Sequence, residues 1–146
     1  MFFKLANEYE TSQIVNWSLG LAEESSMGFI KNNQLMSLEM LTETLKKGGY
    51  YVVAVNGHEI LGWIMLVIDR NFYSDEMVGF IYDLYVWPKY RKNRIGEQLI
   101  NQALFIFKNT GLQKVNLNVF AGNPAKRMYE KLGFYEVTSL MEYRLN

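Results

Sequence analysis

Two periodicities of apolar residues divide the chain into candidate strands and helices. Apolar runs that alternate with polar residues, or continue without a break, are typical of strands. They cover Phe2–Ala6, Tyr50–Val55, Glu59–Ile68, Met77–Trp87, Val115–Phe120, Phe134–Val137 and Leu140–Leu145. Apolar residues that recur every three or four positions predict helices over Glu8–Ala22, Leu35–Lys47, Ile95–Lys108 and Ala125–Leu132. The polar segment Glu23–Gln34 is predicted to be a loop.

Turn residues set the order in which these elements join. Asn56-Gly57 is a dipeptide typical of a tight hairpin, and Pro88 ends the preceding strand because it has no N–H for a ladder. Three consecutive strands then form an antiparallel meander, and a crossover through the third helix makes the next strand parallel. The predicted fold class is α+β, a single domain over residues 1–146. Its sheet is mixed and mostly antiparallel, with about six or seven strands and about four helices on the two faces.

The composition narrows the function classes. Fifteen basic and fifteen acidic residues cancel, which argues against nucleic acid or an anionic membrane as the main partner. The chain has no cysteine and only one histidine, His58, so neither a thiolate nucleophile nor a metal site is expected. No apolar run reaches membrane-spanning length, and the N-terminal run is too short for a signal peptide. A cytoplasmic protein is therefore expected.

The stretch Phe80–Leu99 joins an apolar strand to an amphipathic helix through a short loop with four cations, Lys89, Arg91, Lys92 and Arg94. A helix start leaves backbone N–H groups unpaired and carries a partial positive charge, so it binds phosphate readily. The ligand crevice of a strand–helix–strand unit lies at the carboxyl end of its first strand, which places this loop at the crevice. The alternative is an ordinary junction with a solvated basic face.

Two motifs resemble signatures of the GNAT-type N-acetyltransferase superfamily. The first begins at Val86 and reads Val-Trp-Pro-Lys-Tyr-Arg-Lys-Asn-Arg-Ile-Gly, similar to the family run Val-x-Pro-x-Tyr/His-Arg-Gly-x-Gly-Ile/Leu-Gly. The second begins at Asn123 and contains Tyr-Glu-Lys-Leu-Gly-Phe, similar to the family run that ends Tyr-Glu-Lys-x-Gly-Phe. The order of elements agrees over nearly the whole chain. The resemblance implies the GNAT-like acyl-CoA N-acyltransferase fold, with its central strands splayed apart.

The resemblance also implies that acetyl-CoA is the co-substrate, with its pyrophosphate held by backbone amides of the loop. These are the amides of Arg91, Lys92, Asn93, Arg94, Ile95 and Gly96. The main chain of Leu84, Tyr85 and Val86 would line the pantetheine arm, and Asn123 would be a further cofactor contact. The implied reaction is direct attack of an amine on the thioester carbonyl, with Tyr129 protonating the departing thiolate. The alternative for Tyr129 is a core aromatic residue.

Two of the departures from the family pattern bear on cofactor binding. Arg94 stands where the family has a glycine that lets the backbone pass close to the phosphates. Either a compatible backbone accommodates the arginine, which can then add a phosphate contact, or the affinity for the cofactor falls. Asn123 is displaced by one residue from the family asparagine, whose place is taken by Gly122. Its role in cofactor binding is therefore open.

An amine that binds as a cation must lose a proton before it attacks, so a base near the thioester is expected. Asp83, in the middle of the central strand, is the candidate, because partial burial raises the pKa and basicity of a carboxylate. The alternative is a structural hydrogen bond or exposure at the sheet edge.

The expected function is transfer of an acetyl group from acetyl-CoA to a primary amine of a small molecule or a peptide. No nucleic acid or membrane partner is expected, whereas the apolar C-terminal runs could join two copies in a homodimer. The alternative is a non-catalytic acyl-CoA-binding or regulatory module on the same fold. It is motivated by Arg94 and by the displaced Asn123.

Overall fold

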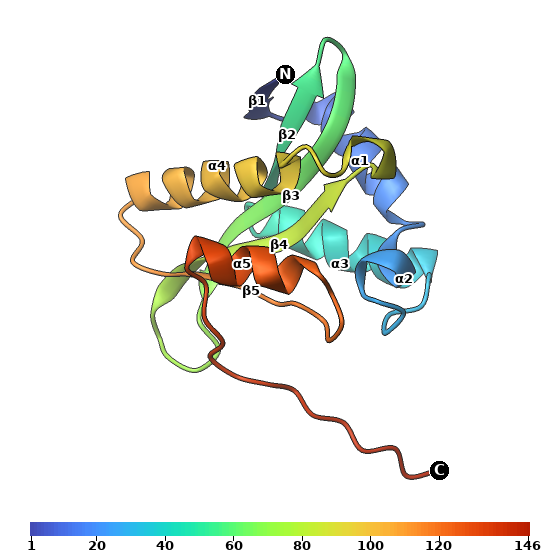
Figure 1. Ribbon diagram of the computed structural model, residues 1–146, viewed down its shortest axis with the longest axis vertical. Coiled ribbons are helices and arrows are strands. Elements are labelled where there is room, and N and C mark those ends of the chain that lie inside the picture. Colours follow the sequence, from blue (N-terminus) through green and yellow to red (C-terminus); the bar gives the residue numbers. More distant parts are fainter.

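The computed structural model describes residues 1–146 and is built on one mixed sheet in the order β1-β2-β3-β4-β5 (Figure 1). The strands are β1 (Phe2–Leu5), β2 (Tyr50–Asn56), β3 (Glu59–Arg70), β4 (Met77–Val86) and β5 (Val115–Leu117). Strands β1 to β4 pair antiparallel with their neighbours, and β5 runs parallel to β4. The predicted meander and the predicted parallel pair are both confirmed.

Helices cover both faces of the sheet. They are α1 (Glu8–Ser18), α2 (Ala22–Ser25), α3 (Gln34–Lys46), the 3-10 turn η1 (Pro88–Tyr90), α4 (Ile95–Asn109) and α5 (Ala125–Leu132). Figure 1 shows α4 and α5 in front of the sheet, with α1 and α3 behind it. Leu99 and Phe107 of α4 are buried in the front core, whereas Ile14 of α1 and Leu41 of α3 are buried in the rear core. None of the helices combines the length and apolar character that crossing a membrane requires.

Local signals explain where these elements begin and end. The hairpin turn between β2 and β3 falls at Asn56-Gly57, where Gly57 has a φ of 63° that suits glycine. Asn7 and Glu10 cap α1 reciprocally, because the amide of each donates to the side chain of the other, at 2.9 and 2.8 Å. The predicted helix Glu8–Ala22 is shorter than expected, since α1 ends at Ser18 ahead of a turn that contains the poor helix former Gly20.

Gly79 on β4 lets α4 pack directly against the sheet. A Cβ atom at this position would lie 2.5 Å from Cγ of Phe107, which is closer than real Cβ contacts come. The Gly79 amide also donates to the carbonyl oxygen of Lys114 at 3.0 Å, where β5 begins. One glycine therefore serves both the packing of α4 and the start of the β4–β5 ladder.

The expectation of about six or seven strands is wrong, because Phe134–Val137 and Leu140–Leu145 form no strand. The chain after α5 extends away from the sheet (Figure 1), and the side chains of Leu140 and Met141 are 98% and 89% exposed. A strand-like sequence forms a strand only where a neighbour completes its hydrogen bonds, and this segment has no such neighbour. The structure also has five α-helices, one more than expected, because α2 forms within the predicted loop.

Candidate active site

The end of β4 has an open edge. β5 pairs with β4 only over Gly79–Ile81, whereas β4 continues to Val86 with β3 as its single neighbour. The register of the β3–β4 ladder shifts at Tyr82, an extra residue that makes a bulge on β4. The main chain of Leu84–Val86 therefore faces no strand on the β5 side. This is the position that the resemblance assigns to the pantetheine arm.

The loop after β4 forms a cup of backbone amides. Lys92 and Arg94 have φ values of 70° and 60°, in the left-handed region that glycine favours. Six consecutive N–H groups, from Lys92 to Glu97, donate no hydrogen bond to an acceptor of the chain. Left-handed residues in such a turn bring successive N–H groups together, and the start of α4 adds its positive helix dipole. The cup can therefore hold an anion. The amide of Arg91 donates to the carbonyl oxygen of Pro88 at 3.3 Å, so the run of unpaired amides begins at Lys92.

The Arg94 side chain does not lie across this cup. Its guanidinium donates two hydrogen bonds to the carboxylate of Glu97, at 3.0 and 3.1 Å, and the side chain is 75% exposed. The backbone at Arg94 is left-handed, a conformation that glycine adopts easily, so the arginine occupies this position with its side chain directed away from the cup. A Cβ added at Gly96 would meet no protein atom nearer than 3.9 Å. A methyl group therefore fits at Gly96, in ordinary van der Waals contact with Leu84 of β4 and Met128 of α5.

Arg91 is tied back to the sheet. Its Nε donates to the carbonyl oxygen of Val86 at 2.8 Å, and its Nη2 donates to the carboxylate of Glu24 at 3.0 Å. Tyr85 lies beneath it, with the guanidinium carbon 5.2 Å from the ring centre, and donates its hydroxyl to the other oxygen of Glu24 at 3.1 Å. Burial raises the pKa of Tyr85, as does the nearby charge of Glu24. The Tyr85 side chain is thus buried, and only its main chain can line the open edge.

Tyr129 projects from α5 into the front core. It is 8% exposed, and its ring meets Phe134 edge-on, with 5.9 Å between the centroids. Burial, together with the charge of Asp83, raises the pKa of Tyr129 to about 12. The phenol therefore carries its proton at neutral pH, as a proton donor must. Both functions foreseen for this residue, core aromatic and acid, are compatible with this position.

Asp83 accepts a hydrogen bond from the indole N–H of Trp63 at 3.2 Å. Burial raises the pKa of Asp83, an effect that the bonds from Trp63 and from the Leu84 amide oppose. Asp83 is paired across the ladder with Met65, a residue of the rear core. Its charge nevertheless contributes to the raised pKa of Tyr129, which lies in the front core. The two candidate catalytic groups therefore lie on opposite faces of the sheet.

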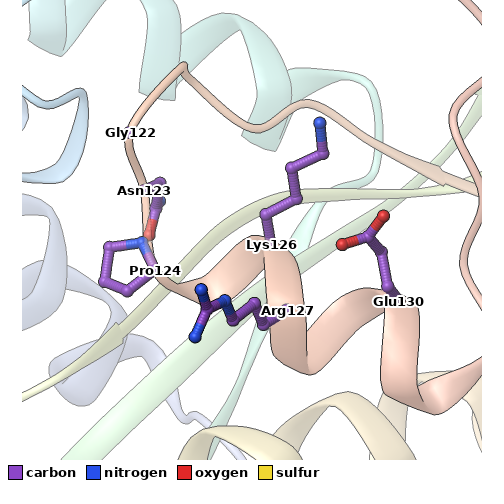
Figure 2. A pocket seen from close by; sticks show the side chains of 6 residues that line it. All are labelled: Gly122, Asn123, Pro124, Lys126, Arg127 and Glu130. Atoms are coloured by element: carbon purple, nitrogen blue, oxygen red, sulfur yellow. The ribbon is translucent and has the colours of Figure 1, made fainter.

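Asn123 lies in the turn before α5. Its Oδ1 accepts a hydrogen bond from the Ala125 amide at 2.9 Å, at the start of α5. It borders an open polar hollow of about 480 Å³ (Figure 2), which is lined by Gly122, Asn123, Pro124, Lys126, Arg127 and Glu130. Figure 2 shows Lys126 and Arg127 pointing in different directions, and Lys126 pairs with Glu136 at 3.0 Å. The hollow has no converging pair of cations, so its fit to phosphate is poorer than that of the amide cup.

An open strand edge beside a cup of unpaired amides, on a sheet covered by helices on both faces, is the arrangement of an αβ acyltransferase domain. The acetyltransferase (GNAT) family model matches residues 10–134. The chain therefore belongs to this family, and it is an N-acetyltransferase.

Individual relatives agree with this assignment. The chain is 32% identical over 147 residues to the [ribosomal protein bS18]-alanine N-acetyltransferase of Haemophilus influenzae, covering 97% of this chain and 80% of that protein. It is 28% identical over 119 residues to the uncharacterized N-acetyltransferase YycN of Bacillus subtilis, covering 77% and 75%. The crystal structure of YycN superposes with a TM-score of 0.78 at 23% identity, over 99% of each chain. This last likeness shows the shared fold.

The contact of Glu24 with Arg91 is a feature of this site that the sequence pattern does not indicate. Glu24 lies 67 positions from Arg91, in a segment predicted to be a loop, and belongs to no motif. Only a paired substitution at both positions across many sequences would reveal such a contact. The structure brings it to the end of β4 because α2 packs beside the loop that follows this strand.

Proposed function

We propose that this enzyme transfers the acetyl group of acetyl-CoA to a primary amine of a small molecule or a peptide. The observation that carries the proposal is the run of unpaired amides from Lys92 to Glu97 at the start of α4. A pyrophosphate has several charged oxygens that accept hydrogen bonds. Backbone amides that the fold already holds in place bind these oxygens without the entropy cost of ordering side chains. The open edge at Leu84–Val86 supports the same proposal, because an extended amide-containing arm can pair with it.

In the proposed reaction, one side chain accepts a proton from the amine and another donates a proton to the thiolate. The amine nitrogen forms a bond to the thioester carbonyl carbon, the carbon–sulfur bond breaks, and the nitrogen releases its second proton to solvent as the amide forms. Asp83, with its raised pKa, takes the proton that the ammonium must lose, and Tyr129 gives its proton to the departing thiolate. Exchange with solvent restores both groups afterwards.

The acceptor is proposed as a chemical class, a primary amine, and not as a particular molecule. A relative at 32% identity is named for acetylating an alanine of a ribosomal protein, which makes a peptide amino terminus one acceptor to test. Small-molecule amines are the other class. Both present a primary amine that is a cation in water, so both need the same deprotonation step.

Calorimetric titration with acetyl-CoA tests the amide cup. Arg94→Gly keeps the left-handed backbone at φ 60°, so we expect saturable binding within about threefold of the wild type. Arg94→Val places a β-branched residue at the same φ, where it is poorly tolerated, so we expect much weaker binding. If acetyl-CoA did not bind to the wild type, the amide cup would not be the cofactor site. If the two variants bound acetyl-CoA equally well, binding would not depend on the left-handed backbone at position 94.

Transfer is tested separately, by thiol release from acetyl-CoA with a panel of amines. The panel contains peptides with a free amino terminus, polyamines and aminoglycosides. We expect acetyl-CoA consumption with at least one of these classes. Binding of acetyl-CoA without transfer to any member would favour a non-catalytic acyl-CoA-binding module instead.

A further inference from the structure

The segment from residue 20 to residue 33, which we call the strap, is attached to both sides of the opening between β4 and β5. On the β4 side, Glu24 accepts hydrogen bonds from Tyr85 and Arg91, at 3.1 and 3.0 Å. On the β5 side, Phe29 stacks on Phe120, with ring centroids 5.5 Å apart and planes 16° from parallel. Phe120 belongs to the connection between β5 and α5, beyond the point where the β4–β5 ladder stops. The strap therefore spans the opening.

The strap is held together internally as one unit. Ser26 is 3% exposed, and its hydroxyl accepts a hydrogen bond from the Ile30 amide at 2.8 Å. The side chain of Asn32 accepts a hydrogen bond from the Glu23 amide at 2.9 Å, which joins the two ends of the turn. Displacement of the strap at Glu24 is thus expected to move its other attachment, at Phe29, as well.

The contact at Glu24 orients Arg91. Two of the guanidinium nitrogens donate hydrogen bonds, Nε to Val86 and Nη2 to Glu24. The guanidinium group also lies over the ring of Tyr85. A guanidinium has five N–H donors, so this arrangement leaves Nη1 without a hydrogen bond, on the residue that immediately precedes the amide cup. Glu24 and Arg91 are about half exposed, which makes their ion pair weak enough to break and re-form.

We propose that Glu24 is a positioning residue, which couples occupancy of the amide cup to the placement of the strap over the acceptor's route to the thioester. This inference rests on the proposed function, because it takes the cup as the acetyl-CoA site. A phosphate group beside Arg91 restrains its side chain, the restrained Arg91 holds Glu24, and Glu24 holds the strap. Binding of the acetyl donor thereby prepares the entrance that the amine uses.

Hydrogen exchange measured by mass spectrometry, with coenzyme A as the probe, tests this coupling without any acceptor. In the wild type, saturating coenzyme A should slow exchange both in the loop 91–97 and in the strap 20–33. In Glu24→Ala the slowing should persist in the loop and disappear from the strap. The dissociation constant for coenzyme A should rise about two- to fivefold, the range expected for a half-exposed ion pair.

The matched control is Glu23→Ala, at the neighbouring position. Glu23 pairs with Lys31 at 3.1 Å on the surface, so this variant should show the wild-type response in both segments. Thermal denaturation of all three proteins checks that the fold is retained. Wild-type protection of the loop without protection of the strap would overturn the coupling, as would an unchanged strap response in Glu24→Ala. Absence of protection in both segments of the wild type would instead refute the amide cup.

Discussion

Replacement of Gly79 by alanine tests whether one close contact fixes the position of α4. The added Cβ would lie 2.5, 2.6 and 2.7 Å from three ring atoms of Phe107, a fully buried residue of α4. Overpacking in a closed core costs about 3 kcal/mol when a rigid ring must move. Alanine recovers about 0.5–1 kcal/mol through the lower entropy of its unfolded backbone. The net expected loss is therefore about 2 kcal/mol, which lowers the melting temperature by about 4–8 °C in a domain of this size.

Urea denaturation followed by tryptophan fluorescence measures this loss, and a double-mutant cycle assigns it to the contact. Phe107→Leu alone should cost about 1–2 kcal/mol, because it leaves a small cavity. In the Gly79→Ala background the same change should cost less than in the wild type, or even stabilise the protein, since it removes the clash. The control Gly20→Ala adds a Cβ that meets no atom nearer than 4.0 Å, so its stability should remain close to that of the wild type.

Two results would refute this reasoning. One is a Gly79→Ala variant as stable as the wild type, which would mean that α4 can shift freely on the sheet. The other is strict additivity with Phe107→Leu, which would place the destabilisation elsewhere. Because α4 begins at the amide cup, the same variant should also bind coenzyme A more weakly than Gly20→Ala does.

Further predictions concern the two candidate catalytic residues. Tyr129→Phe should lower the rate of acetyl transfer about a hundredfold or more with little change in acetyl-CoA affinity, whereas an unchanged rate would exclude the acid role. The control Tyr51→Phe removes a buried hydroxyl without a hydrogen-bond partner in the rear core, and should leave the rate unchanged and stability equal or higher. Burial raises the pKa of Asp83 above its usual 3.8, so the folded state holds this proton more tightly than the unfolded state does. This contribution to stability is present below pH 3.8 and is lost as the pH rises through the folded-state pKa. Asp83→Asn should therefore lose less stability between acidic and neutral pH than the wild type, and parallel urea-denaturation curves across this range would contradict the assignment.

Local sequence signals were sufficient for most of the elements that build the site. The helical spacing of Ala125–Leu132 matches α5, and the Asn56-Gly57 dipeptide marks the observed hairpin. The basic loop after β4 and the start of α4 were also placed correctly relative to each other. These features depend on residues within a few positions of one another, so a linear pattern contains the information.

Contacts between distant segments could not be predicted in this way. The sequence does not indicate that Glu24 meets Arg91, nor that Asp83 turns toward Trp63 on the rear face of the sheet. It also predicted C-terminal strands that the structure lacks, because strand propensity says nothing about whether a ladder partner is within reach.

By itself, the sequence determined the family, the order of the elements and the types of residue that lie in and after β4. Only the tertiary structure decided that Lys92 and Arg94 adopt the glycine-like backbone, that six amides remain unpaired, and that the strap contacts both sides of the opening. The physical reason is that a side chain's type and spacing are fixed along the chain. The direction in which an amide points, and the group opposite it, depend on how the whole sheet and its helices pack.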